Sequence, residues 1–302
     1  MSAALTAFVS RELKAPLNDA IRAAAERLAR SRGSVAVLFY GSNLRTGDLD
    51  GVLDFYVLTD APRAWHAAVT GWLWPTVSFR ELKVGNRVLR AKVATMPIDT
   101  FEKATVGAML DTTVWARFAQ PTALAWVRSP AMEARIVEAV SSAATTAARF
   151  AAVVGPAQGS ASDFWQALFR ETYRAEFRVE PPGREAQILA NYPGRYAALL
   201  PIAWSAGGVA FHSRDATFDP RLTDEDYRYF ARAWLIRARI GKALNLVRLV
   251  KAAFSFEGAA RYGLWKIERH TGLSVPLTPW RERHPLLAAP EVLWRVFRAT
   301  SR

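Results

Sequence analysis

The chain has 302 residues, of which 51% are hydrophobic, including 11 Trp and 16 Phe, so it can bury a sizeable core in one large or two medium domains. It contains no Cys, which excludes disulfides and thiolate metal sites, and its four His residues form no close pair with the spacing of a zinc site. The formal net charge of +13 favours an acidic or anionic partner.

Two features bear on membranes and export. Residues 1–17 lack a basic start followed by an apolar core, so we expect no secretory signal. The longest charge-free stretch, residues 196–211, is short for a bilayer span and contains Pro201. We therefore expect no transmembrane helix, and a chain without Cys fits a reducing cytoplasm.

The first part of the chain has the pattern of a helix followed by strands. Residues 5–32 are rich in Ala, with apolar residues at helical spacing, and predict a helix. Two short runs, 35–40 and 52–58, are β-branched and aromatic and are bounded by turn residues, so they predict adjacent strands of a covered sheet. A third strand is expected over residues 88–95, and residues 99–127 look helical, with an end near Pro121.

The second part is mostly helical and basic. Residues 131–154 predict an Ala-, Ser- and Thr-rich helix, and the segment GPAQGSAS, residues 155–162, is the clearest linker signal in the chain. We therefore expect an α/β domain over residues 1–130, with a mixed sheet and flanking helices, followed by a mostly helical domain over residues 131–302.

The turn between the two first predicted strands is a candidate anion site. Gly41 lets the backbone come close to a ligand, and successive N–H groups in such a turn can hold an anion, with the Ser42 hydroxyl as a further donor. This arrangement would suit the phosphates of a nucleotide. A simple tight turn after a strand is the alternative.

Asp54 lies inside the second apolar run, where an ionised carboxylate is costly unless a cation or hydrogen bonds satisfy it. Mg²⁺ is the obvious cation, because it is usually held by one or two carboxylates together with substrate phosphates. Backbone donors could also satisfy this carboxylate. The combination with the Gly41-Ser42 turn favours a nucleotide triphosphate site.

The positive charge is concentrated near the end of the chain. From residue 231 onward there are 14 Lys or Arg and 4 Asp or Glu. Within this part, residues 229–254 predict a helix with apolar residues near one face, whereas Arg232, Arg239 and Lys242 lie largely off that face. Such a segment can bind an anionic membrane surface, follow a nucleic-acid backbone, or simply be solvated.

Several segments, in order along the chain, resemble one family. YGSNLRTGDLDGVLDFYV is similar to the motif of the mitochondrial-type phosphatidate cytidylyltransferases, within the DNA-polymerase-β-type nucleotidyltransferase superfamily. The other segments that carry the resemblance are PRAWHAAV (62–69), LRAKVATM (89–96), WARFAQP (115–121), YRAEFR (173–178) and the basic stretch 246–272. In WARFAQP, Ala replaces the family's Gly and Gln replaces its Lys.

The resemblance implies a reaction and a location. Phosphatidate and CTP would give CDP-diacylglycerol and pyrophosphate with Mg²⁺, catalysed by a cytoplasmic protein bound peripherally to the inner face of the membrane. The anionic lipid surface would then explain the basic C-terminal part, and nucleic acid becomes the less favoured partner.

The resemblance also implies residue roles. Gly41 and Ser42 would contact the CTP phosphates, Tyr40 would help to bind the nucleotide, and Asp54 would bind the metal. Lys92 would act with Asp54 in catalysis. Lys92 and Arg117 are both expected on a phosphate of CTP or phosphatidate. Arg174 and Arg178 are weaker candidates for the lipid phosphate.

The chain departs from the superfamily in its acidic residues. Superfamily members usually carry two acids two residues apart on the strand, and Val52 stands at the first of these positions. Asp48 and Asp50, in the preceding loop, are the candidates for a second metal ligand. Two other functions remain open on the sequence: a nucleotidyltransferase acting on RNA, a small molecule or a protein, and a non-catalytic basic adaptor for membranes or nucleic acid.

Overall fold

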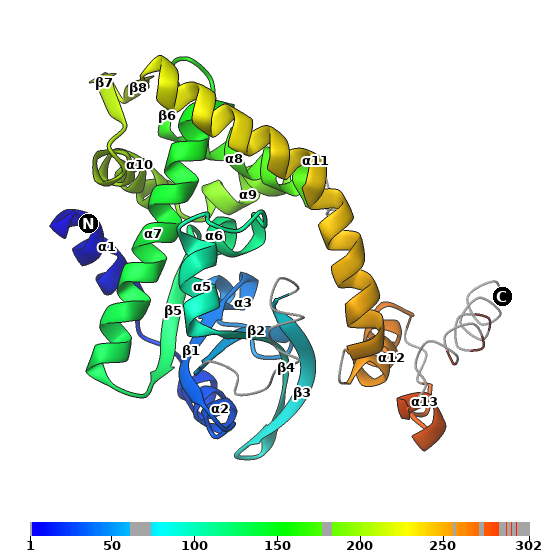
Figure 1. The fold of residues 1–302 in the computed structure, drawn as a ribbon. Coiled ribbons are helices and arrows are strands. Elements are labelled where there is room, and N and C mark those ends of the chain that lie inside the picture. Colours follow the sequence, from blue (N-terminus) through cyan, green and yellow to red (C-terminus); the bar gives the residue numbers. More distant parts are fainter. Residues whose placement is uncertain are drawn as a thin grey trace.

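The computed structural model describes residues 2–60, 74–176, 183–255, 258–271 and 275–283, together with positions 288, 291 and 294. A five-stranded sheet with the strand order β3-β4-β2-β1-β5 lies between helices (Figure 1). Its strands are β1 (Ser34–Tyr40), β2 (Val52–Thr59), β3 (Thr76–Val84), β4 (Arg87–Pro97) and β5 (Thr122–Val127). Strands β2 and β4 pair in parallel and the other neighbours are antiparallel, which confirms the predicted α/β fold with a mixed sheet.

One face of the sheet packs against α2 (Asp19–Ala29), whose Ile21, Ala24 and Leu28 join a core with alternate residues of the strands. The helix expected over residues 5–32 is in fact two helices, because α1 (Ala3–Leu13) ends before Pro16 and α2 starts afresh. The Asn18 side chain caps this second start by accepting a hydrogen bond from the N–H of Ala20 at 2.8 Å.

The other face carries the larger core. It packs against α1, α5 (Ile98–Thr105), α6 (Thr113–Phe118), α7 (Pro130–Val154), α8 (Ala161–Ala175) and α10 (Pro193–Gly207). Trp115, Trp165 and Trp204 are fully buried in it. The indole N–H groups of Trp165 and Trp204 donate to the carbonyl oxygens of Tyr196 and Ala148, at 3.1 and 2.7 Å, so these two side chains are buried with their polar atoms satisfied.

The helical segment expected over residues 99–127, ending near Pro121, contains α5 and α6, but no strand was expected after it. Residues 122–127 form β5, which pairs with β1 at the edge of the sheet. Pro121 cannot continue a helix, and the six residues that follow reach the free edge of β1. The opposite edge strand, β3, was also not expected.

Residues from both sides of the predicted boundary at residue 130 share one hydrophobic core, which runs from Leu5 to Val209. The linker segment 155–162 contains β6 (Gly159–Ser160), which joins β7 (Ala210–Arg214) and β8 (Thr217–Arg221) in a small sheet with the order β6-β8-β7. Ser160 then caps α8 in a capping box with Asp163. The division into two domains stays a prediction.

The C-terminal part is built on α11 (Asp224–Ser255), followed by α12 (Ala259–Thr271) and α13 (Pro279–Arg283); a shorter helix, α9 (Arg184–Ala190), lies earlier in the chain. Helix α11 runs along α7 and α8 and then reaches β3 (Figure 1). Its contact with α8 is close, because a Cβ at Gly241 would lie 2.7 Å from the carbonyl oxygen of Ala175. Within the described residues, no helix combines the length and the apolar character that crossing a bilayer requires.

Candidate active site

Three polar side chains form one row across the centre of the sheet. Tyr40 on β1 is paired with Asp54 on β2, and Asp54 is paired with Lys92 on β4. Directly opposed residues of neighbouring strands project to the same face of a sheet, so the phenol, the carboxylate and the ammonium group lie side by side. This face is the one that also packs against α5 and α6.

The turn after β1 brings the backbone against this row. Gly41 has φ +90° and ψ −167°, a conformation that is essentially restricted to glycine. A Cβ at Gly41 would lie 2.7 Å from Oδ2 of Asp54, so there is no room for a side chain. Ser42 begins the short helix α3 (Ser42–Thr46), and its hydroxyl is exposed at the end of the strand.

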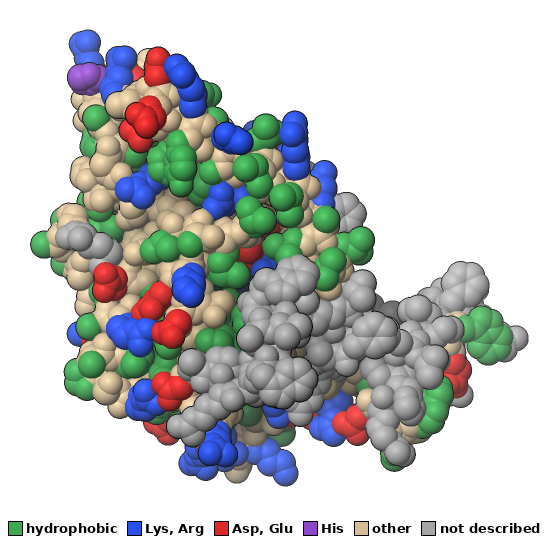
Figure 2. Space-filling model, in the orientation of Figure 1, with side chains coloured by type: hydrophobic (Ala, Val, Ile, Leu, Met, Phe, Trp, Pro, Cys, Tyr) green, Lys and Arg blue, Asp and Glu red, His purple; other side chains and the backbone are tan. Residues whose placement is uncertain are grey.

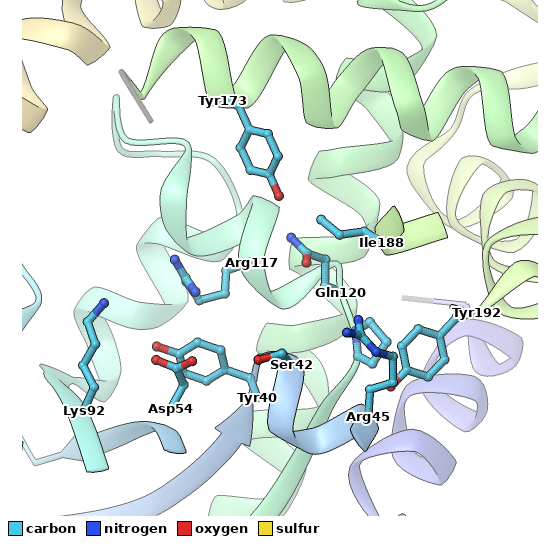
Figure 3. Close-up of a pocket in the computed structure, with 12 residues that line it drawn as sticks. Tyr40, Ser42, Arg45, Asp54, Lys92, Arg117, Gln120, Tyr173, Ile188 and Tyr192 are labelled. Carbon is cyan, nitrogen blue, oxygen red and sulfur yellow. The ribbon is translucent and has the colours of Figure 1, made fainter. Parts of the chain in front are cut away.

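These residues line a pocket with a volume of about 430 Å³ between the sheet and the helices (Figure 3). Its walls come from β1, β2, β4, α3, α6, α8, α9 and the turns next to them. The lining residues are Tyr40, Gly41, Ser42, Arg45, Asp54, Lys92, Arg117, Gln120, Pro121, Tyr173, Ile188 and Tyr192. Figure 3 shows the sheet residues on one side and the helix residues reaching toward them from the other.

The charges in the pocket are coupled. Burial raises the pKa of the Asp54 carboxyl above its ordinary value, and the positive charges of Lys92 and Arg117 oppose part of this rise. Burial therefore destabilises the ionised form of the Asp54 carboxylate, and a further cation bound next to it would stabilise that form. Asp54 is the one carboxylate that lines the pocket within the described part of the chain.

Arg117 is held over the site by an aromatic ring. Its guanidinium carbon lies 4.9 Å from the ring centre of Tyr40, a cation–π geometry. Burial alone would lower the pKa of Arg117, but Tyr40, Asp54 and Glu176 together raise it above its ordinary value. The group is therefore a permanent cation beside a partly dehydrated carboxylate, which is a suitable place for the anionic oxygens of a phosphate.

The structure brings together six of the residues expected at the site, namely Tyr40, Gly41, Ser42, Asp54, Lys92 and Arg117. The other described candidates do not line this pocket. Asp48 and Asp50 are exposed in the loop before β2, where an oxygen of the Asp48 carboxylate accepts the N–H of Asp50 at 2.8 Å. Arg174 is exposed and forms an ion pair with Glu171 at 2.6 Å.

Two expectations fall outside the described residues. They are Arg178 and the segment 62–69, which belongs to the resemblance.

Sequence reasoning missed the other half of the pocket. Arg45 and Tyr173 lie in segments that carried the resemblance, but nothing in their local pattern set them apart, and Gln120 stood out only as the replacement of the family's Lys. Ile188 and Tyr192 had no local signal, since tertiary packing of α9 and the turn after it brings them here.

The described residues contain no group of three or more Asp, Glu or His that could hold a metal by itself. One partly buried carboxylate in a pocket that also holds Lys92 and Arg117 does fit Mg²⁺ of the kind that takes most of its ligands from substrate phosphates and water. Asp54 is the residue that would hold it.

No protein-family model matches the chain, and no curated protein matches it by sequence. Among solved structures, the crystal structure of a nucleotidyltransferase-like protein from Exiguobacterium sibiricum is similar to it, with a TM-score of 0.28 and 12% sequence identity. The similarity covers 86% of this chain and 82% of that chain. At this score the similarity does not assign a family, so the functional argument is built on the pocket itself.

Proposed function

We propose that the pocket binds a nucleoside triphosphate and that the protein is a nucleotidyltransferase. The observation that carries this proposal is the placement of the Asp54 carboxylate between Lys92 and Arg117, against the side-chain-free Gly41 turn. Such a site offers a metal ligand, two cations and close backbone approach in one place. These are the groups that phosphoryl and nucleotidyl transfer needs, because its catalysis is mainly positioning and neutralisation of charge.

In this reaction an oxygen of the acceptor attacks the α-phosphorus of the nucleotide in line with the departing group. A new P–O bond forms, the bond between the α-phosphorus and its bridging oxygen breaks, and pyrophosphate leaves with the electron pair. Mg²⁺ bound at Asp54 would neutralise negative charge on the reacting phosphates. Lys92 and Arg117 would hold phosphate oxygens, and the Gly41-Ser42 turn would position the nucleotide.

At a finer level, we propose that the donor is CTP and that the acceptor is phosphatidate, giving CDP-diacylglycerol at the inner face of a membrane. Two points support this choice. The Tyr40–Val57 segment resembles the cytidylyltransferase motif, and its Tyr, Gly, Ser and Asp residues all reach the pocket. The acceptor is an anionic lipid, which suits a chain of net charge +13 whose excess of basic residues follows residue 231.

The test is transfer of label from CTP into a chloroform-extractable product, with purified protein, Mg²⁺ and vesicles that contain phosphatidate. We expect lipid-soluble label that depends on phosphatidate, is highest with CTP, and disappears in Asp54→Asn. Label from another nucleotide, or transfer to a non-lipid acceptor, would overturn the lipid reaction and keep nucleotidyl transfer. Nucleotide binding without transfer to any acceptor would overturn the enzyme and favour a non-catalytic adaptor.

A further inference from the structure

Helix α11 has a solvent-facing row that combines hydrophobic and cationic side chains. We call this row, which consists of eight exposed residues, the α11 stripe: Arg232, Leu235, Ile236, Arg239, Ile240, Lys242, Leu246 and Val247. The aliphatic members are well exposed, with 62% of Leu246, 48% of Leu235 and 42% of Ile240 open to solvent. Figure 2 shows green and blue side chains together along the ridge that α11 forms in Figure 1.

Near its start, α11 packs Phe230, Ala233 and Trp234 against the core, as an ordinary surface helix does. Further along, polar groups hold its inner face: Arg237 donates to the carbonyl oxygen of Met109 at 3.2 Å, and Arg248 pairs with Asp111 at 2.7 Å. Gly241 makes the close contact with α8. The apolar residues of the stripe are therefore left outside although the helix is firmly attached.

The charge of α11 indicates what covers the stripe. Residues 227–255 contain seven Lys or Arg and no Asp or Glu. From Arg232 to Val247 the stripe extends about 22 Å along the helix, at a rise of about 1.5 Å per residue. Aliphatic side chains flanked by cations on one face are typical of helices that lie in the interface of an anionic bilayer.

We infer that the α11 stripe is the surface on which the protein docks to an anionic lipid bilayer. The aliphatic side chains enter the headgroup region, and Arg232, Arg239 and Lys242 lie beside lipid phosphates. A second copy of the chain fits less well, because two stripes packed face to face would bring like charges together. The inference deepens the proposed function by naming the surface that meets the lipid, and its observations lie outside the pocket.

Co-sedimentation with vesicles tests this inference, using the full chain without nucleotide. The vesicles are phosphatidylcholine alone, or phosphatidylcholine mixed with phosphatidate or with phosphatidylglycerol. We expect binding to both anionic mixtures, little binding to phosphatidylcholine, and weakening by salt.

Two sets of variants locate the surface. Arg232→Gln/Arg239→Gln/Lys242→Gln should reduce partitioning roughly a hundredfold, from the contribution of about three cations near a charged surface. The matched control, Arg22→Gln/Arg27→Gln/Arg30→Gln, removes the same charge from exposed positions on and next to α2 and should bind much more like the unmodified protein. Ile240→Gln/Leu246→Gln should also weaken binding, whereas Val88→Gln/Val106→Gln, at equally exposed sites elsewhere, should not.

Equal losses in the stripe variants and their controls would show attraction by net charge alone and would overturn the inference. So would a dimer, seen by sedimentation velocity, that Ile240→Gln/Leu246→Gln splits while vesicle binding is unchanged. Because nucleotide is absent, docking is measured separately from the reaction. A protein that docks but transfers nothing would overturn the proposed function and keep the docking surface.

Discussion

Gly41 and Asp54 are in contact at the centre of the pocket, in a way that leaves no space for a side chain on the glycine. A Cβ at position 41 would meet Oδ2 of Asp54 at 2.7 Å, and the backbone there has φ +90°. The turn that would hold the nucleotide phosphates and the carboxylate that would hold the metal are thus fitted directly against each other.

The first prediction concerns this contact. Gly41→Ala should cost about 1–3 kcal/mol of stability through backbone strain and should also displace the Asp54 carboxylate, so turnover should be lost. Gly33→Ala is the matched control, since Gly33 has φ +81° with nothing near its missing side chain. It should show a similar fall in melting temperature with turnover retained. If the two variants were equally active, the close contact between Gly41 and Asp54 would not be required for turnover.

The second prediction is a gain in stability when Asp54 is neutralised. Burial raises the pKa of Asp54 in the folded protein, so the folded state binds this proton more tightly than the unfolded state. Its contribution to stability is therefore full below the ordinary pKa of 3.8 and is lost as the pH rises through the folded pKa. Without ligand at neutral pH, Asp54→Asn should melt at a higher temperature than the unmodified protein, with turnover reduced roughly a hundredfold or more.

Thermal unfolding at several pH values measures this difference, which should shrink toward acid pH. A less stable Asp54→Asn at neutral pH would mean that the pairing with Lys92 and Arg117 outweighs desolvation.

The third prediction concerns the acid limb of the pH–rate profile. Lys92 lowers the pKa of Asp54, opposing the larger effect of burial. Lys92→Met should therefore raise this pKa further and move the acid limb of kcat/KM to higher pH, besides lowering the plateau. Arg27→Met, at an exposed position on α2 at the opposite face of the sheet, should leave both unchanged. If the plateau fell but the acid limb did not move, Lys92 would act only by contacting the substrate and not by lowering the pKa of Asp54.

The fourth prediction concerns the choice of base. The Gln120 side chain donates through Nε2 to the carbonyl oxygen of Ala116 at 3.1 Å, so its Oε1 is the atom that can accept from a ligand in the pocket. Cytosine presents an amino group, which can donate to Oε1 of Gln120, where uracil presents an oxygen, which cannot. An acceptor that faces another acceptor without a hydrogen bond is costly. CTP should bind more tightly than UTP, and Gln120→Leu should bring the two affinities together. Competition binding measures the ratio, with Tyr173→Phe as the control at another lining position. An unchanged ratio with binding retained would contradict this role.

The fifth prediction concerns the attachment of α11. Asp111 and Arg248 form a buried ion pair, with side chains only 4% and 13% exposed. Asp111→Ala would leave the buried guanidinium unpaired and should destabilise the protein by about 3–5 kcal/mol. Asp60→Ala breaks an exposed pair with Arg128 and should cost about 0–1 kcal/mol. Urea unfolding distinguishes the two, and equal midpoints would show that the buried pair adds no net stability.

The central strands were predictable because their residues are apolar and β-branched and are bounded by turns. Within the five-stranded sheet, sequence reasoning missed β3 and β5, which are its two edge strands. Edge strands are only partly covered, so charged residues such as Arg80 and Glu81 interrupt the apolar pattern of β3. Strand β5 directly follows the turn at Pro121, and it could be recognised only by its pairing with β1.

The same distinction applies to the pocket. Gly41, Ser42 and Asp54 stand out because a turn glycine and a strand carboxylate are exceptions to a local apolar pattern. Tyr173 and Tyr192 are ordinary helix and turn residues until α8 and α9 are packed over the sheet. For α11 the sequence shows apolar residues at helical spacing but not which of them turn inward. That choice is set by the packing of Phe230 and Trp234 against Phe150 and by the contacts of Arg237 and Arg248.

The pairing of Tyr40, Asp54 and Lys92 in one row makes the site sensitive to register rather than to loop length. Residues may be gained or lost between Gly47 and Gly51 without changing which face Asp54 occupies, provided that its pairing with Tyr40 is kept. A single-residue insertion inside β2 would instead turn the carboxylate toward the α2 face, among Phe39 and other core side chains. Insertions and deletions should therefore be tolerated in the loop, whereas inserting an odd number of residues within β2 should destroy the site.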